Sequence, residues 1–415
     1  MTSLIAPSMT SRVVIIGGGV AGARTAAALR ELEYPGSVDL VCAEEHLPYD
    51  RPPLSKECLL RPGAEPTLVN DAGFYAGANV RLHLGLAALA VDAAARTVRL
   101  TDHSMLPYDW LVLATGAEPR ALDVPGSALE GVTALRTLSE ATFIGQRFEP
   151  HKRVVIIGGG FIGLETAAAA RERGCEVTVI EAGARLMARS VCAEVSQAVA
   201  VLHAAHGVTL RFGVRPLRFE GRGAVERVHL DDGTVVEADL VIVGVGISPQ
   251  VSLARDAGLT VDDGVLVDKE CRSCDSHIFA VGDCARAPDA VLNRHRRLES
   301  WEAARAHAWI AASAIAGTPI PPLAPAWLWS QQYDTLLQIS GATGCGGRTV
   351  VRGDPARLDF IVFEILDERV VGATAVNRGR DMPWVRRLIA RAAPVDTYAL
   401  ANEARPLRAA LEPSC

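Results

Sequence analysis

Two short apolar runs, each followed by a glycine turn and an alanine-rich stretch, dominate the pattern along the chain. Residues 12–31 are RVVIIGGGVAGARTAAALRE and residues 153–172 are RVVIIGGGFIGLETAAAARE, so that fifteen of the twenty positions match. Each apolar run is rich in β-branched residues and ends at a glycine, which predicts a buried parallel strand. The alanine-rich stretch favours a helix. The chain is therefore predicted to contain two strand–turn–helix units of the same design.

The turn in both units has the spacing G-x-G-x-x-G. In such a turn the first glycine allows the tight bend, the second lets a pyrophosphate approach the backbone, and the third lets helix and strand pack closely. The helix N-terminus then offers free N–H groups to phosphate oxygens. The chain is therefore predicted to bind two dinucleotides, most naturally FAD and a nicotinamide that exchange electrons. The glycines are Gly17, Gly19 and Gly22 in the first unit and Gly158, Gly160 and Gly163 in the second.

An acidic residue follows the next strand of each unit, where it would bind a ribose hydroxyl. In the second unit this residue is Glu181, and in the first it is Glu44, with Glu45 the less favoured choice. The Glu181 carboxylate should accept a hydrogen bond from a ribose 2′-hydroxyl and repel a 2′-phosphate. NADH is therefore predicted over NADPH, although Arg185 and Arg189 nearby leave residual use of NADPH open.

The composition narrows the class of protein. A net charge of −6 argues against binding to nucleic acid through phosphate contacts. No apolar stretch reaches the length of about 18 residues that a transmembrane helix needs, and residues 1–11 lack the features of a signal peptide. Nine scattered cysteines without an export signal favour reduced thiols in the cytoplasm. No cluster of ligands indicates a metal site; the CxxC spacing of Cys271 and Cys274 is treated as incidental and its role is left open.

A proline-rich stretch predicts the start of another domain. GTPIPPLAPAW at 317–327 marks the boundary, and about 90 residues follow it. They contain strand-like runs at 358–366 and 369–376 and a helical segment near 383–392. Together with the two glycine units, this pattern predicts about three domains, as the chain length also does.

Three further motifs, DRPPLSK at 50–56, ATG at 114–116 and GD at 282–283, carry a resemblance to a known family. With the glycine turns, they make nearly the whole chain resemble the FAD-dependent, NADH-using ferredoxin reductases that serve oxygenases, of the rubredoxin, putidaredoxin and biphenyl-dioxygenase ferredoxin reductase type. The resemblance implies an α/β fold with two Rossmann-like, glutathione-reductase-like dinucleotide-binding domains and a C-terminal α+β domain. The implied domains are FAD-binding at 1–118 and 246–322, NAD-binding at 119–245, and a C-terminal interface domain at 323–415.

The resemblance also implies which residues contact the flavin. Lys56 would lie beside flavin N5, where a cation favours the reduced ring. Asp283, at the end of a strand, suits an acceptor for the ribityl hydroxyls, and Trp329, preferred over Trp327, would cover the ring. A helix that starts near Trp301 would aim its N-terminus at the pyrimidine ring. The FAD set is Gly17, Gly19, Val20, Ala21, Gly22, Glu44, Arg51, Pro53, Lys56, Ala114, Thr115, Gly116, Gly282, Asp283, Glu299, Ser300, Trp301 and Trp329.

On the nicotinamide side, the resemblance implies that Phe161 covers the pocket and that Glu165 faces the place where the nicotinamide amide would meet Lys56. Lys56 and Glu165 are therefore the candidate catalytic residues. A place in the core for Phe161, and a partnership with the helix dipole for Glu165, remain alternatives. The NAD set is Gly158, Gly160, Phe161, Ile162, Gly163, Glu165, Glu181, Gly244, Val245 and Gly246.

The implied reaction moves a hydride from NADH to FAD and then single electrons to a small acidic iron–sulfur ferredoxin that feeds an oxygenase. Residues 51–56 contain no cysteine, so no thiol would relay the electrons. Two arginine groups could attract an acidic partner, since complementary charge guides docking. They are Arg294, Arg296 and Arg297 in one group, and Arg386, Arg387 and Arg391 in the other.

Two alternatives of different classes stay open at this point. One is an NADH oxidase or another NADH-dependent flavoprotein reductase. The other is a redox-sensing interaction protein that resembles apoptosis-inducing factor. The sequence leaves open whether the protein is a monomer or a homodimer, which ferredoxin and oxygenase it serves, and what the final substrate is.

Overall fold

The computed structural model describes residues 11–411, and all structural statements below concern these residues. The chain forms two compact units, each described here by itself. Unit 1 contains the first glycine turn and unit 2 contains the second. The units comprise Met1–Arg51, Thr67–Glu118 and Ser248–Ala326 in unit 1, and Pro52–Pro66, Pro119–Ile247 and Trp327–Cys415 in unit 2.

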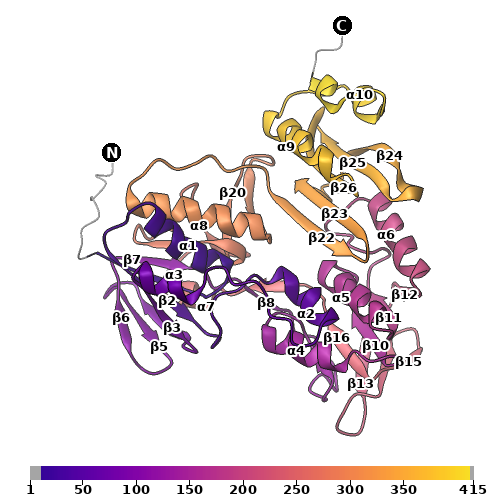
Figure 1. Cartoon of the computed structure of the whole chain (residues 1–415), viewed down its shortest axis with the longest axis horizontal. Helices are drawn as coiled ribbons and strands as arrows, with labels where there is room; N and C mark the ends of the chain where they lie inside the picture. Colours follow the sequence, from indigo (N-terminus) through magenta and orange to yellow (C-terminus); the bar gives the residue numbers. More distant parts are fainter. Residues whose placement is uncertain (1–10, 412–415) are drawn as a thin grey trace. The chain divides into compact units, whose positions relative to one another are not determined.

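Unit 1 is built on a five-stranded parallel sheet with the order β19-β7-β1-β2-β3 (Figure 1). The Val and Ile side chains of the central strand are buried, as continuous β-branched runs in parallel sheets are. Helices α1 and α8 pack together, and the alanines on α1 allow close approach. The bounds are β1 Arg12–Ile16, β2 Ser37–Cys42, β3 Val80–Leu84, β7 Trp110–Leu113, β19 Ile278–Ala280, α1 Val20–Glu31 and α8 Trp301–Ala316.

Smaller elements complete unit 1. Two three-stranded sheets, β4-β5-β6 and β18-β20-β21, accompany the parallel sheet, and the chain crosses between the units within the short strands β8 and β17. The bounds are β4 Ala88–Asp92, β5 Thr97–Leu100, β6 Met105–Pro107, β18 Val265–Leu266, β20 Ala285–Asp289, β21 Arg294–Arg297, α3 Ala72–Gly77, α7 Ser252–Asp256, β8 Ala117–Pro119 and β17 Ile247–Pro249.

Unit 2 repeats the design of unit 1 in its own parallel sheet, β12-β11-β10-β16-β9. The alanine-rich helix α5 follows the central strand β10, as the duplicated pattern predicts. The bounds are α2 Glu57–Leu60, β9 Val132–Thr133, α4 Leu138–Arg147, β10 Arg153–Ile157, α5 Phe161–Glu172, β11 Glu176–Glu181, α6 Ala193–Ala205, β12 Thr209–Phe212, β13 Pro216–Glu220, β14 Arg227–Leu230, β15 Val235–Glu237 and β16 Leu240–Val243.

An antiparallel sheet with the order β22-β23-β26-β25-β24 forms the C-terminal part of unit 2, with α9 and α10 beside it (Figure 1). Its apolar face shares a core with α5 and α6, through residues such as Leu164, Val199, Leu337 and Phe360. The predicted α/β class with a C-terminal α+β region is confirmed. The bounds are β22 Trp327–Gln332, β23 Thr335–Gly341, β24 Arg348–Asp354, β25 Asp359–Leu366, β26 Arg369–Val376, α9 Met382–Arg391 and α10 Thr397–Ala401.

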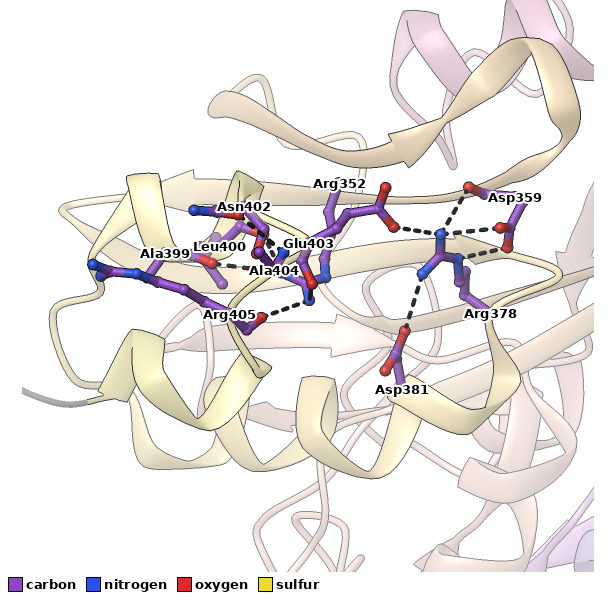
Figure 2. A network of polar contacts seen from close by, with 10 residues as sticks. All are labelled: Arg352, Asp359, Arg378, Asp381, Ala399, Leu400, Asn402, Glu403, Ala404 and Arg405. Atoms are coloured by element: carbon purple, nitrogen blue, oxygen red, sulfur yellow. Dashed lines mark hydrogen bonds and ion pairs between the residues drawn. The ribbon is translucent and has the colours of Figure 1, made fainter.

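Two arginines tie the last described segment to this sheet (Figure 2). The Arg352 guanidinium is buried and donates to the carbonyl oxygens of Leu400 at 3.1 Å, Asn402 at 2.8 Å and Arg405 at 2.8 Å. Arg378 makes ion pairs with the carboxylates drawn beside it in Figure 2. The Arg352 contacts satisfy backbone carbonyls of the last described segment, and the Arg378–Glu403 ion pair adds a second attachment.

Replacing Arg352 with leucine should loosen this segment. Three carbonyls would lose a charged donor, which predicts a loss of about 3 kcal/mol in the local free energy of opening. Hydrogen exchange of the amides in 397–405 measures it. The matched control is Arg348→Leu on the same strand, whose exposed side chain lies 3.9 Å from Glu368 and should contribute less than about 1 kcal/mol. Equal protection in both variants would contradict the prediction.

Candidate functional site

The first glycine turn leaves open space at the N-terminus of α1. A Cβ on Gly17 would lie 2.1 Å from the Ala114 oxygen, and one on Gly22 would lie 2.0 Å from the Gly17 oxygen, so both positions require glycine. A Cβ on Gly19 would meet nothing within 4 Å. Gly19 is also the N-cap of α1, where no side chain satisfies the first N–H groups. We call this turn, Gly17–Gly22, the first cradle; its shape and donors fit a pyrophosphate.

The second glycine turn has the same geometry, and we call Gly158–Gly163 the second cradle. A Cβ would lie 2.4 Å from the Gly244 oxygen at Gly158 and 2.2 Å from the Gly158 oxygen at Gly163, whereas nothing lies within 4 Å at Gly160. Gly160 is the N-cap of α5 and also lacks a side-chain partner. Each unit thus contains one glycine turn whose shape and free N–H groups fit the pyrophosphate of a dinucleotide.

The two predicted ribose ligands lie beside these cradles. Glu181 ends β11 and accepts hydrogen bonds from the backbone N–H groups of Gly159 at 2.8 Å and Gly183 at 2.6 Å. Glu44 accepts from the Tyr49 hydroxyl at 2.5 Å and from Arg51 at 3.1 Å. A carboxylate has about four acceptor positions, so each of them retains capacity for a ribose hydroxyl.

The surroundings of Glu181 also bear on coenzyme choice. The Arg185 guanidinium donates to the carbonyl oxygens of Val191 at 2.8 Å and Ala188 at 3.0 Å, and is therefore held by its own loop. Arg189 lies close to Gly246, a residue of the predicted NAD set with φ of +106°. A carboxylate faces the cradle while one of the two arginines is already bound to backbone, an arrangement that favours a free 2′-hydroxyl.

Three strand ends of unit 1 bring the remaining backbone segments of the predicted FAD set together. Ala114, Thr115 and Gly116 follow β7, and the Thr115 hydroxyl donates to the Gln250 oxygen at 2.6 Å. Gly282 begins a 3₁₀ turn after β19, and a Cβ there would lie 2.9 Å from the Ala21 side chain. The first cradle, the ATG turn and the GD turn with Asp283 therefore meet at the carboxyl edge of one parallel sheet, where ligands bind in such folds.

The start of α8 is fixed by polar contacts within unit 1. Ser300 caps the helix by accepting from the Ala303 N–H at 3.1 Å. The Trp301 indole donates to Asp50 at 2.7 Å, a partner that the sequence analysis missed. Glu299 makes an ion pair with Arg297 at 2.5 Å. In unit 2, Trp329 stacks on Trp327 with ring centroids 5.1 Å apart.

Lys56 and Glu165 form a buried ion pair within unit 2. The Lys56 ammonium lies 2.6 Å from one Glu165 oxygen, and the two side chains are 15% and 4% exposed. The Ser55 hydroxyl donates to the same Glu165 oxygen, and Ser330 donates to the other oxygen at 2.7 Å. Lys56 also donates to the Pro52 carbonyl at 3.2 Å. The carboxylate on α5 thus holds a cation that is 109 positions away in the sequence.

The segment that carries Lys56 is attached to the second glycine unit, although it follows the first unit in sequence. Arg173, after α5, donates to the carbonyl oxygens of Leu59 at 3.2 Å and Phe148 at 2.7 Å. Residues 52–66 accordingly belong to unit 2, so the DRPPLSK motif is divided: Arg51 lies in unit 1, and Pro53 and Lys56 lie in unit 2. The boundaries predicted from the sequence remain a prediction.

Several residues around Glu165 were missed by the sequence analysis: Ser55, Ser330, Gln332 and His203. Ser330 and Gln332 are buried on one face of β22, while Gln331 between them is exposed. The sequence did contain an indication of this cluster: two polar side chains stand at alternate positions of a strand, on the face that is buried. Ile162 of the predicted NAD set is exposed, and Phe161 packs partly against the core shared by α5 and the C-terminal sheet.

Cys42, which lies beside the first cradle, and Cys58, which follows Lys56, are not suited to act as nucleophiles. Burial raises the pKa of Cys42 to about 12 and raises the pKa of Cys58 as well. Cys271 is buried and Cys274 is exposed, and both are free thiols. Only the thiolate form of a cysteine acts as a nucleophile, so the buried thiols of Cys42, Cys58 and Cys271 are inert at neutral pH. Within residues 11–411, no group of three His, Cys, Asp or Glu side chains could hold a metal ion.

The two arginine groups differ in structure. Arg296 makes an ion pair with Asp289 at 2.8 Å, and Arg297 makes ion pairs with carboxylates on both sides, so the first group is largely neutralised. On α9, Arg387 and Arg391 are exposed.

In the described part of the chain, no helix has the length and apolar character needed to cross a bilayer.

Comparisons with known proteins place this architecture. Residues 11–308 match the model of the pyridine nucleotide-disulphide oxidoreductases, and residues 327–411 match the reductase C-terminal family. The chain is 44% identical to the anthranilate 1,2-dioxygenase system ferredoxin–NAD(+) reductase component of Burkholderia cepacia over 94% of this chain and 96% of that one. It is 39% identical to rhodocoxin reductase of Rhodococcus erythropolis, over 92% and 90%.

Among solved structures, the reductase in the covalent putidaredoxin reductase–putidaredoxin complex matches with a TM-score of 0.94 at 35% identity, over 97% of this chain and 98% of that chain. The resemblance to ferredoxin reductases drawn from the motifs is thereby confirmed. With its two glycine cradles, its buried lysine–glutamate pair and its C-terminal antiparallel sheet, the chain belongs to the pyridine nucleotide-disulphide oxidoreductase family.

Proposed function

We propose that this protein is an NADH-dependent ferredoxin reductase that passes electrons through FAD to a small, acidic iron–sulfur ferredoxin serving an oxygenase. The observation that carries the proposal is the pair of cradles, open at Gly19 and Gly160, in a chain whose relatives are ferredoxin–NAD(+) reductase components. The two cradles match two dinucleotides. The relative from Burkholderia cepacia is named as a component of a dioxygenase system, and an oxygenase consumes electrons, which favours flow from NADH to ferredoxin.

In the proposed arrangement, unit 1 binds FAD. Gly19 and the N-terminus of α1 hold the pyrophosphate, Glu44 holds the ribose, and Asp283 accepts from the ribityl chain. FAD would supply a hydride acceptor at N5 and the ability to release electrons one at a time. The acceptor positions of Glu44 that Tyr49 and Arg51 leave free suit the ribose hydroxyls.

Unit 2 binds NADH through the second cradle and Glu181. Lys56 would supply a fixed positive charge to the reacting rings, and Glu165, 2.6 Å from the Lys56 ammonium, would hold that charge in position. The chain would provide orientation and electrostatics and no covalent chemistry, because burial raises the pKa of the Cys42 and Cys58 thiols and keeps them protonated. NADH and two oxidised ferredoxins thus give NAD⁺, two reduced ferredoxins and one proton.

The exposed arginines of α9 are the better of the two candidate surfaces for an acidic ferredoxin, since the other group is paired with carboxylates. The eight described cysteines are all free thiols, which supports a cytoplasmic location. An NADH oxidase is disfavoured because such enzymes use a reactive cysteine, whereas burial raises the pKa of Cys58, two residues after Lys56, and raises the pKa of Cys42 at the end of β2 to about 12.

The test is an anaerobic stopped-flow experiment on the purified yellow protein. NADH should bleach the flavin band faster than NADPH does, and ferredoxins should then restore it in one-electron steps. Steady-state reduction of cytochrome c by NADH should rise steeply with added ferredoxin. A colourless protein that takes up no FAD, or rapid peroxide formation that ferredoxin does not change, would overturn the proposal.

Replacing Glu181 with alanine should shift coenzyme preference toward NADPH. The change removes an acceptor for the 2′-hydroxyl and the repulsion of a 2′-phosphate, so the ratio of kcat/KM for NADPH over NADH should rise about 10- to 100-fold. Reduction kinetics with both coenzymes measure the ratio, and the flavin content should stay at the wild-type level. An unchanged ratio would show that Glu181 does not contact the ribose.

A further inference from the structure

A line of hydrogen bonds runs from the C-terminal sheet into Glu165. The Ser330 hydroxyl donates to Glu165 at 2.7 Å, the Gln332 amide donates to Ser330 at 3.0 Å, and the Gln332 oxygen lies 2.9 Å from Nε2 of His203. Ser330 and Gln332 lie on β22, His203 lies on α6, and Glu165 lies on α5. We call Ser330, Gln332 and His203 the donor chain.

The direction of the donor chain is fixed by its end. Glu165 can only accept, so the single Ser330 proton points toward it. Ser330 then accepts from the Gln332 NH₂ group, which turns the Gln332 oxygen toward His203. Nε2 of His203 must therefore carry the proton, and Nδ1 must carry the lone pair. Every member donates toward the same carboxylate.

The burial of the donor chain makes this direction costly to reverse. Ser330, Gln332 and His203 are each fully buried, and Nδ1 of His203 has no partner. Burial lowers the pKa of His203 to about 4, so the ring is neutral at physiological pH. The rings of Tyr333 and His206 face this region from the end of β22 and from the end of α6. In such surroundings a misdirected donor would leave a buried polar atom unpaired.

We propose that Ser330, Gln332 and His203 are positioning residues for hydride transfer, which hold the Glu165 carboxylate and, through it, the Lys56 ammonium. The C-terminal region then takes part in the chemistry as well as in partner binding. This inference rests on the proposed function, because it assigns the Lys56–Glu165 pair to the reacting rings. The effect of each residue should decline with its distance from Glu165 along the donor chain.

The kinetic test compares Ser330→Ala, Gln332→Met and His203→Phe in the flavin-loaded protein. The rate constant of flavin reduction at saturating NADH should fall about tenfold, about fourfold and about twofold in that order, since a hydrogen bond to a charged group contributes most. The dissociation constant of NADH should stay within about twofold. The matched control is Ser196→Ala, a buried α6 serine that donates to the Leu186 oxygen at 2.7 Å outside the donor chain. Its rate constant should not change.

A double variant separates positioning from mere packing. Once Ser330 is replaced by alanine, Gln332→Met should slow flavin reduction no further, because the path to Glu165 is already cut. A change that acted on flavin reduction through local packing alone would slow it further in the double variant. Equal slowing in the single variants and the Ser196 control, or additive slowing in the double variant, would overturn the proposal.

A measurement that does not depend on turnover tests the direction itself. Nitrogen NMR of ring-¹⁵N-labelled histidine should show His203 with its proton on Nε2 in the wild type, and a loss of that fixed tautomer in Gln332→Met. A proton on Nδ1 in the wild type would refute the donor chain. If wild-type flavin were not reduced by NADH, the proposed function would fail, while this spectrum would still decide the direction of the donor chain.

Discussion

Replacing Gly19 with valine is expected to give a folded protein that has lost its flavin. The backbone at Gly19 has φ of −78° and ψ of −176°, which any residue adopts, and a Cβ there meets nothing within 4 Å. The protein itself therefore tolerates the side chain. The valine methyl groups would instead occupy the space of the pyrophosphate, so FAD should bind more weakly by at least about 3 kcal/mol, or over a hundredfold.

The other cradle provides the matched control. Gly160→Val makes the same change at the same backbone geometry, and should keep the flavin while NADH binding is lost. The ratio of flavin to protein absorbance and calorimetric titration with NADH distinguish the two variants, and circular dichroism reports folding. Gly22→Val should behave differently from both, because its Cβ would lie 2.0 Å from the Gly17 oxygen and the turn could not form. If Gly19→Val kept its full flavin content, the assignment of FAD to the first cradle would be wrong.

The cradles could be predicted from the sequence because every residue that shapes them is local. The strand, the turn and the helix lie within twenty residues, and the spacing of Gly17, Gly19 and Gly22 follows from the geometry of one turn. The same argument applies to Glu181, which ends the next strand of its unit. The strand–turn–helix sequence is repeated at an offset of 141 residues, so the dinucleotide-binding turn was indicated twice.

The surroundings of Glu165 could not be predicted in this way. Ser55, Ser330 and His203 reach the same region from segments that are more than a hundred residues apart, and no local pattern encodes such meetings. The ion pair between Arg297 and Glu299 could not be predicted from the sequence for a different reason. Both residues suggested contacts with a ligand or partner on their own, and only the folded chain shows that they pair with each other.

The Lys56–Glu165 pair should separate stability from catalysis. Lys56→Met leaves a buried carboxylate without its cation, and Glu165→Gln leaves a buried ammonium without its anion. Each single variant should lose about 3 to 5 kcal/mol of unfolding free energy, because an unpaired buried charge is costly. Each should also slow flavin reduction by NADH about a hundredfold, because the fixed positive charge is removed in one and released in the other.

The double variant Lys56→Met/Glu165→Gln is the decisive measurement. It removes both buried charges of the pair. The glutamine oxygen could accept from one of the two serine hydroxyls, Ser55 and Ser330, while its NH₂ group donates to the other, so thermal unfolding should return most of the way to the wild-type midpoint. Flavin reduction in the stopped-flow instrument should stay slow, since the cation is still missing. If the rate recovered together with the stability, the pair would serve only to hold residues 52–66 against α5, and the proposed role of Lys56 at the reacting rings would be wrong.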